Sequence, residues 1–150
     1  MFWDLENPAA VSSRLDPEDL QVVIQRFLDA CSKAMDRLNG YIAKYMGDGM
    51  LVYFGYPHAH ENDAERAVHA GLAILDTARA LDRDNLHPQF GIAARIGIAT
   101  AQAVVGELMG PDTARERTVC GETPILTSRP QAPAKPDPFS IDQATERRFG

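Results

Sequence analysis

Two aspartates occupy positions in this 150-residue chain where a carboxylate could do chemistry. Asp48 stands between Gly47 and Gly49, and the tripeptide separates two apolar and aromatic segments, a pattern typical of a β-hairpin tip. Asp4 interrupts an apolar, strand-like segment, where a lone acid needs a partner or a cation. Mg²⁺ prefers one or two carboxylates together with substrate phosphates. The pair therefore predicts a metal and phosphate site, although an ordinary Gly-Asp-Gly turn would give the same tripeptide.

Strands and helices alternate in the segments that must position these aspartates. The predicted elements are a strand at residues 1–5, a helix at 17–38 with Asp16 as N-cap and Asn39-Gly40 as stop, hairpin strands at 41–46 and 50–55, a helix from about 62 to 81, and strands at 91–100 and 103–108. The order β-α-β-β-α-β predicts an α+β fold, namely a ferredoxin-like sheet with its helices on one face.

Composition restricts the class of protein. A chain that is 45% hydrophobic and 24% charged is expected to form one soluble globular domain. The net charge of −6 argues against a nucleic-acid partner, because phosphate backbones are bound by basic surfaces. No secretory signal and no apolar stretch of membrane-spanning length is present in the sequence, so we expect a cytoplasmic protein without a membrane partner. Cys31 and Cys120 are too few for a disulfide framework.

Six blocks of sequence together resemble one known family. They are MFWDL (1–5), AVSSRLDPEDL (10–20), AKYMGDG (43–49), GYP with HENDAERA (55–57 and 60–67), RIGIAT (95–100) and ERTVCGETP (116–124). Their order and spacing are similar to those of class III nucleotidyl cyclases, bacterial adenylate cyclases in particular. The resemblance implies a cyclase catalytic domain at residues 1–129 that begins inside its first strand. Residues 130–150 are expected to be a Pro-rich, poorly ordered connection followed by a short C-terminal helix.

The resemblance implies a lyase that converts ATP to cyclic AMP and pyrophosphate in signal transduction. Asp4 and Asp48 look like the carboxylates that hold two Mg²⁺ or Mn²⁺ ions, one at the ribose 3′-hydroxyl and one at the triphosphate. Such ions support in-line attack on the α-phosphorus. The family forms its active site at a dimer interface, so the resemblance also implies a homodimer.

Four further residues match nucleotide-binding positions of that family. Lys44 and Thr118 correspond to the pair that binds the purine, and a lysine in place of an acid favours ATP over GTP. Arg129 matches the arginine that neutralises charge developing on the phosphate, and Arg95 matches a phosphate-contacting arginine.

Each of these residues also has a structural interpretation. By strand alternation Lys44 shares a face with Ile42 and Met46, where a lone lysine is typical of a solvated edge strand. Arg95 could be a structural cation within a strand. The histidines near the second helix are not expected to bind zinc, because no cysteine or second spaced pair completes four ligands; they are His58, His60 and His69.

Several departures from the family pattern favour a second hypothesis. Ile125 stands where active members carry an asparagine that hydrogen-bonds the ribose, and one such donor is worth on the order of 10²–10³ in rate. Pro8 removes a backbone donor and Glu6 adds repulsion in the phosphate-binding loop. The family's C-terminal strands and their phosphate-binding lysine are not expected within this chain. The alternative is an impaired homologue that binds nucleotide or dimerises without turnover. A diguanylate cyclase is disfavoured, since its Gly-Gly-Asp/Glu-Glu-Phe signature is missing.

Overall fold

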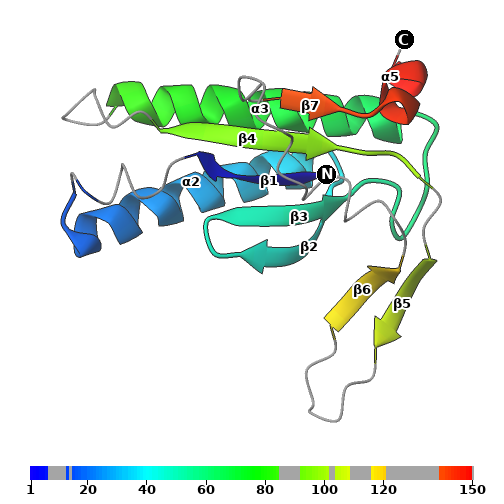
Figure 1. Cartoon of the computed structure of the whole chain (residues 1–150), viewed down its shortest axis with the longest axis horizontal. Coiled ribbons are helices and arrows are strands. Elements are labelled where there is room, and N and C mark those ends of the chain that lie inside the picture. The colour runs from blue at the N-terminus through cyan, green and yellow to red at the C-terminus, as the bar shows by residue number, and fades with distance from the viewer. Residues whose placement is uncertain are drawn as a thin grey trace.

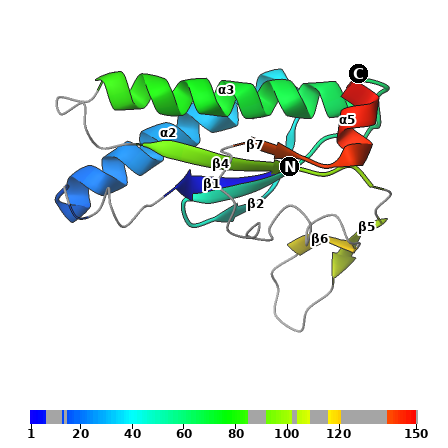
Figure 2. The same cartoon turned by 45° about the horizontal axis from the view of Figure 1, so that its top comes forward.

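A five-stranded sheet with two long helices on one side frames the fold (Figures 1 and 2). The computed structural model describes residues 1–6, 13, 15–84, 92–101, 104–108, 116–120 and 139–149. The elements are β1 (Phe2–Glu6), α2 (Pro17–Arg37), β2 (Tyr41–Met46), β3 (Gly49–Tyr53), α3 (Asp63–Asp84), β4 (Ala93–Ile98), β5 (Val104–Leu108), β6 (Glu116–Cys120), β7 (Phe139–Ile141) and α5 (Gln143–Phe149). In this part of the chain, no helix combines the length and the apolar character needed to cross a membrane.

The strand order β2-β3-β1-β4 confirms the predicted ferredoxin-like sheet. The central strand β1 pairs antiparallel with β3 on one side and with β4 on the other. A fifth strand, β7, which no sequence pattern indicated, pairs parallel with β4 at the outer edge. Strands β5 and β6 pair only with each other among the described strands and form a separate two-stranded sheet.

The core lies between the sheet and the two long helices. Alternate strand residues are buried, as expected for a sheet with one face packed on helices. Trp3 of β1 is fully buried and meets Phe27 of α2 edge-on, with ring centroids 5.2 Å apart. Cys31 of α2 lies in the same cluster, and burial raises the pKa of its thiol to about 12. Cys31 is therefore an inert core residue.

Helix α2 begins and ends where the sequence signals predict. Asp16 is the N-cap residue and Pro17 opens the helix, where its fixed φ fits and its missing N–H costs nothing. Asn39 adopts a left-handed φ of 55°, and the N–H of Gly40 donates to the carbonyl of Met35 at 2.9 Å. This turn directs the chain into β2, and so fixes where the hairpin that carries Asp48 begins.

A polar cluster attaches the C-terminal segment to the end of β4. The carboxylate of Asp142 accepts the backbone N–H of Thr145 at 2.8 Å and that of Thr100 at 3.3 Å. The hydroxyls of Thr100 and Thr145 lie 2.7 Å apart, and Thr145 is fully buried. Strand β7 joins the main sheet beside β4, and the short helix α5 packs against α3. The predicted Pro-rich connection, residues 130–138, lies outside the described residues.

Candidate active site

The far face is the side of the five-stranded sheet opposite α2 and α3. Strand alternation places Phe2, Asp4 and Glu6 of β1 on it, because Trp3 and Leu5 between them are buried against the helices. On the neighbouring strand, Arg95 is paired directly with Asp4 in the antiparallel register. The far face thus carries the first predicted metal ligand beside the predicted phosphate-binding arginine.

Arg95 forms a two-point ion pair with Asp4. Its Nε donates to Oδ1 at 3.1 Å and its Nη2 donates to Oδ2 at 2.7 Å. The hydrogen bond to Asp4 raises the pKa of Arg95 above its ordinary value, and the charges of Asp4, Glu6 and Asp48 also raise it against partial desolvation. In this structure the guanidinium of Arg95 is paired with a carboxylate, as the structural interpretation expects. The same guanidinium is the group that is predicted to contact a phosphate.

Asp48 reaches the same region from the β2–β3 hairpin. Gly47 at the tip has a φ of 67°, which a residue with a side chain rarely adopts. Gly49 packs so closely on β1 that an added Cβ would overlap the Trp3 carbonyl oxygen and lie 3.0 Å from the Cα of Asp4. Asp48 therefore lies one residue from the contact with Asp4, and its charge also raises the pKa of Arg95, so Asp4, Asp48 and Arg95 are grouped here as the aspartate cluster.

The donor set fits a divalent cation that shares its coordination with substrate. Among the described residues, no group of three or more His, Cys, Asp or Glu side chains could hold a metal ion by itself. Two carboxylates suit Mg²⁺ or Mn²⁺, which keep waters and take substrate phosphates as further ligands. The Asp4 side chain is 23% exposed, and each carboxylate offers about four lone-pair sites, so the pairing with Arg95 leaves acceptor capacity.

Lys44 lies on the edge strand β2, as predicted, but not on the predicted face. The pairing of β2 with β3 shifts by one residue between Ile42 and Lys44, which is a β-bulge at Ala43. Lys44 pairs with Leu51, which in turn pairs with Phe2 of the far face. The expectation that Lys44 shares a face with Met46 agrees with the register, whereas the expectation that it shares a face with Ile42 is wrong, because the bulge interrupts the alternation. Lys44 is instead exposed on the side that carries Asp4.

The remaining predicted site residues are placed less fully. Thr118 pairs with Gly106 in the β5–β6 sheet, so the two predicted purine-binding residues belong to different sheets. Arg129, Ile125 and Pro8 lie outside the described residues. The roles of all these residues stay predictions.

The histidines at the start of α3 lie beside carboxylates. His60 Nδ1 lies 3.4 Å from Asp63 Oδ1, and the backbone N–H of His60 donates to Asp63 Oδ2 at 2.7 Å. The same carboxylate accepts a hydrogen bond from Arg66. A Cβ at Gly55, whose φ is 90°, would lie 2.7 Å from Asp63 Oδ2, so this cluster orders the turn from β3 into α3.

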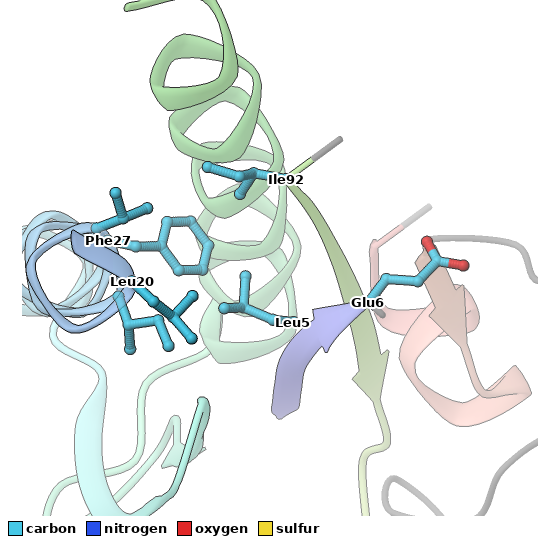
Figure 3. Close-up of a pocket in the computed structure, with 7 residues that line it drawn as sticks. Leu5, Glu6, Leu20, Phe27 and Ile92 are labelled. Carbon is cyan, nitrogen blue, oxygen red and sulfur yellow. The ribbon is translucent and has the colours of Figure 1, made fainter. Parts of the chain in front are cut away.

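An apolar pocket lies on the helix side of the sheet (Figure 3). Its lining residues are Leu5, Glu6, Leu20, Val23, Ile24, Phe27 and Ile92. In the close-up, Leu5 points toward Phe27 and Leu20, whereas Glu6 points to the opposite side of β1. The pocket is therefore a gap at the margin of the core and is separate from the aspartate cluster.

Two features of the site were missed by reasoning from sequence. The Asp4–Arg95 pairing depends on the register of two strands that are about ninety residues apart, and the sequence carries no local signal for it. The bulge did leave a signal, since the apolar Ile42 and Tyr45 are three residues apart where strict alternation would place them on opposite faces.

Comparisons with known proteins identify the family of the chain. A family model described as the adenylate and guanylate cyclase catalytic domain matches residues 1–149. The protein "Adenylate cyclase 1" of Rhizobium meliloti is 28% identical over 132 residues, which cover 86% of this chain and 19% of that protein. The chain thus spans about a fifth of the length of this curated relative.

Two solved structures resemble the chain in both sequence and fold. The adenylyl cyclase CyaB from P. aeruginosa is 30% identical with a TM-score of 0.74, and the match covers 85% of this chain and 67% of that one. The guanylyl cyclase Cya2 is 26% identical with a TM-score of 0.79, covering 99% and 76%. The similar structures thus include cyclases of both purine types.

Proposed function

The chain belongs to the family of adenylate and guanylate cyclase catalytic domains, and from this premise we propose that it converts ATP to cyclic AMP and pyrophosphate. The observation that carries the proposal is the aspartate cluster, in which Asp4 and Arg95 lie on paired strands and Asp48 lies in the turn before the neighbouring strand β3. Two carboxylates and a guanidinium are the groups needed to bind a triphosphate together with divalent cations.

In the proposed mechanism Asp4 and Asp48 would hold two Mg²⁺ or Mn²⁺ ions. When bound, such ions activate the ribose 3′-hydroxyl and offset the charge of the triphosphate. The side chains of Asp4, Glu6 and Asp48 would otherwise repel an anionic substrate. Arg95 is ion-paired with Asp4 and its side chain is 47% exposed, so it can turn from Asp4 toward a phosphate oxygen.

Recognition of the base is assigned to Lys44 and Thr118. A lysine ammonium donates hydrogen bonds and accepts none, which suits the unprotonated ring nitrogens of adenine. The two residues belong to different sheets, and the proposal places them in a site completed by a second copy of the chain. In such a homodimer one copy supplies the metal carboxylates, and the other supplies the base-binding residues with Arg129.

The second candidate function is nucleotide binding or dimerisation without turnover. The observation that favours it is the apolar residue Ile125. It stands at the position where the resemblance expects an asparagine that hydrogen-bonds the ribose. The two functions share the aspartate cluster and differ only in the rate of the chemical step.

Restoring the donor tests the two functions against each other. In the presence of Mn²⁺, the wild type should form cyclic AMP from ATP slowly, and Ile125→Asn should raise the rate by up to about 10²–10³-fold. The assay is repeated with GTP, because the proposal requires ATP to be the better substrate. If neither protein forms product while both bind Mn²⁺ and ATP, the binding function replaces the enzyme. Full activity in the wild type would show that Ile125 does not lie at the ribose.

A further inference from the structure

The β-bulge in β2 changes which residues of this strand can meet a ligand. On one side of the shift Ile42 pairs with Val52, and on the other side Lys44 pairs with Leu51. Between these two pairs β3 advances by one residue and β2 by two, and Ala43 is the additional residue of β2. Directly opposite residues of an antiparallel pair project to the same face, so the cross-strand partners report the face of each side chain.

Ile42 and Tyr45, which stand on either side of Ala43 and Lys44, both lie on the helix face, the side of the sheet that α2 and α3 cover. Ile42 packs against the buried core, and its partner Val52 is fully buried. The hydroxyl of Tyr45 lies 3.2 Å from the hydroxyl of Ser32 on α2, and its partner Met50 is also fully buried. Ala43 and Lys44 stand between two residues that face the helices.

Lys44 projects to the far face with its partner Leu51, and Ala43 is not among the partly buried apolar residues that pack on the core. We propose that the bulge places Ala43 and Lys44 next to each other on the far face, and that Ala43 is a specificity-determining residue that contacts the nucleotide base beside Lys44. The inference deepens the proposed function and rests on it.

The chemistry of the two side chains suits a heteroaromatic ring. Lys44 offers charged donors for a ring nitrogen, whereas the Ala43 methyl offers a small apolar surface and leaves room for the plane of the ring. A larger side chain at position 43 would occupy that room. In a binding pocket, one or a few additional methylene groups typically change affinity by about 10-fold or more.

Substitution of three consecutive residues separates the bulge from simple alternation. Ala43→Leu, Lys44→Ala and Tyr45→Leu are compared with the wild type for binding of Mn²⁺–ATP and of Mn²⁺–tripolyphosphate, which lacks the base and the ribose. With the bulge, the first two changes should each weaken ATP binding about 10-fold and leave tripolyphosphate binding unchanged, and Tyr45→Leu should change neither. Thermal unfolding of each variant verifies that the sheet is retained.

The outcomes distinguish this inference from the proposed function. Effects at positions 43 and 45 but not at 44 would mean regular alternation and would overturn the inference. Wild-type ATP affinity in Ala43→Leu would also overturn it, while the proposed function would stand if the wild type still prefers ATP to tripolyphosphate. A wild type that binds both ligands equally has no base site, and then the inference and the proposed base recognition fail together.

Discussion

The helix face and the far face belong to the same strands but depend on different physical effects. On the helix face, Trp3 packs against Phe27 of α2, and close packing holds both almost completely buried side chains in place. On the far face, Asp4 and Arg95 are partly exposed and held by charge and strand register. Hydrophobic pattern alone therefore specifies one face, whereas the chemistry of the other requires knowledge of which residues stand opposite each other.

The largest expected effect on stability is at the centre of the helix face. Phe27→Ala removes a ring that packs edge-on against Trp3, and we expect a loss of about 3–5 kcal/mol in the free energy of unfolding. Urea denaturation followed by the fluorescence of Trp3, the single tryptophan, measures it. Val22 on the same helix is 51% exposed, so Val22→Ala should change stability by less than about 0.5 kcal/mol. Equal losses in both variants would mean that α2 does not pack as described.

On the far face, Asp48→Asn should affect function far more than stability. The substitution removes one of the two carboxylate charges, so Mn²⁺ binding should weaken, and cyclic nucleotide formation should fall by about 100-fold or more. Calorimetry with Mn²⁺ and a cyclic AMP assay measure the two effects. The control is Asp76→Asn on the exposed side of α3, which should alter neither. Unchanged Mn²⁺ binding in Asp48→Asn would contradict the assignment of the metal site.

Arg95→Gln should change metal binding and phosphate binding on the far face in opposite directions. Without the guanidinium, the oxygens of Asp4 are free, so Mn²⁺ alone should bind more tightly. Mn²⁺–tripolyphosphate should bind more weakly, by about 10-fold, because a charge-assisted hydrogen bond is lost. Arg79→Gln serves as the matched control, since Arg79 is paired with Asp76 at the surface of α3. If both ligands weaken together, Arg95 positions Asp4 and does not bind phosphate.

A pH-dependent effect on stability concerns the amino group of Met1 in the 150-residue polypeptide. This group is buried and donates to the Val52 carbonyl at 2.8 Å, and desolvation lowers its pKa from 8.0 to about 5. The fold favours the neutral amine, so this contribution to stability is complete above pH 8 and is lost as the pH falls toward 5. Acetylated Met1 cannot titrate, and the stability difference between the two forms should therefore change over this interval. A difference that is constant with pH would refute the prediction.

Much of the fold could be predicted from local sequence signals. Pro17 and Asn39 mark the ends of α2 within a residue or two, and the Gly-flanked Asp48 locates the hairpin. Strand β7 was missed because its three residues follow a Pro-rich segment and show no periodicity of their own. It forms because β4 offers a free edge, which is a property of the assembled sheet.

The candidate site could be predicted only in part. The identity of Asp4, Asp48 and Lys44 followed from motifs, whose spacing is local. The pairing of Asp4 with Arg95 and the face of Lys44 could not follow, since both depend on how distant strands align. The structure was therefore needed to establish which face of the sheet each side chain occupies and which side chains it contacts.

The bulge at Ala43 also affects how the molecule behaves at high concentration. β2 is an edge strand, and an edge strand with free backbone groups can recruit a strand of another molecule and begin aggregation. A bulge interrupts the even spacing of those groups, and the charge of the exposed Lys44 repels an approaching copy of the same edge. The irregularity that places Lys44 on the far face thus also discourages the sheet from growing into a fibre.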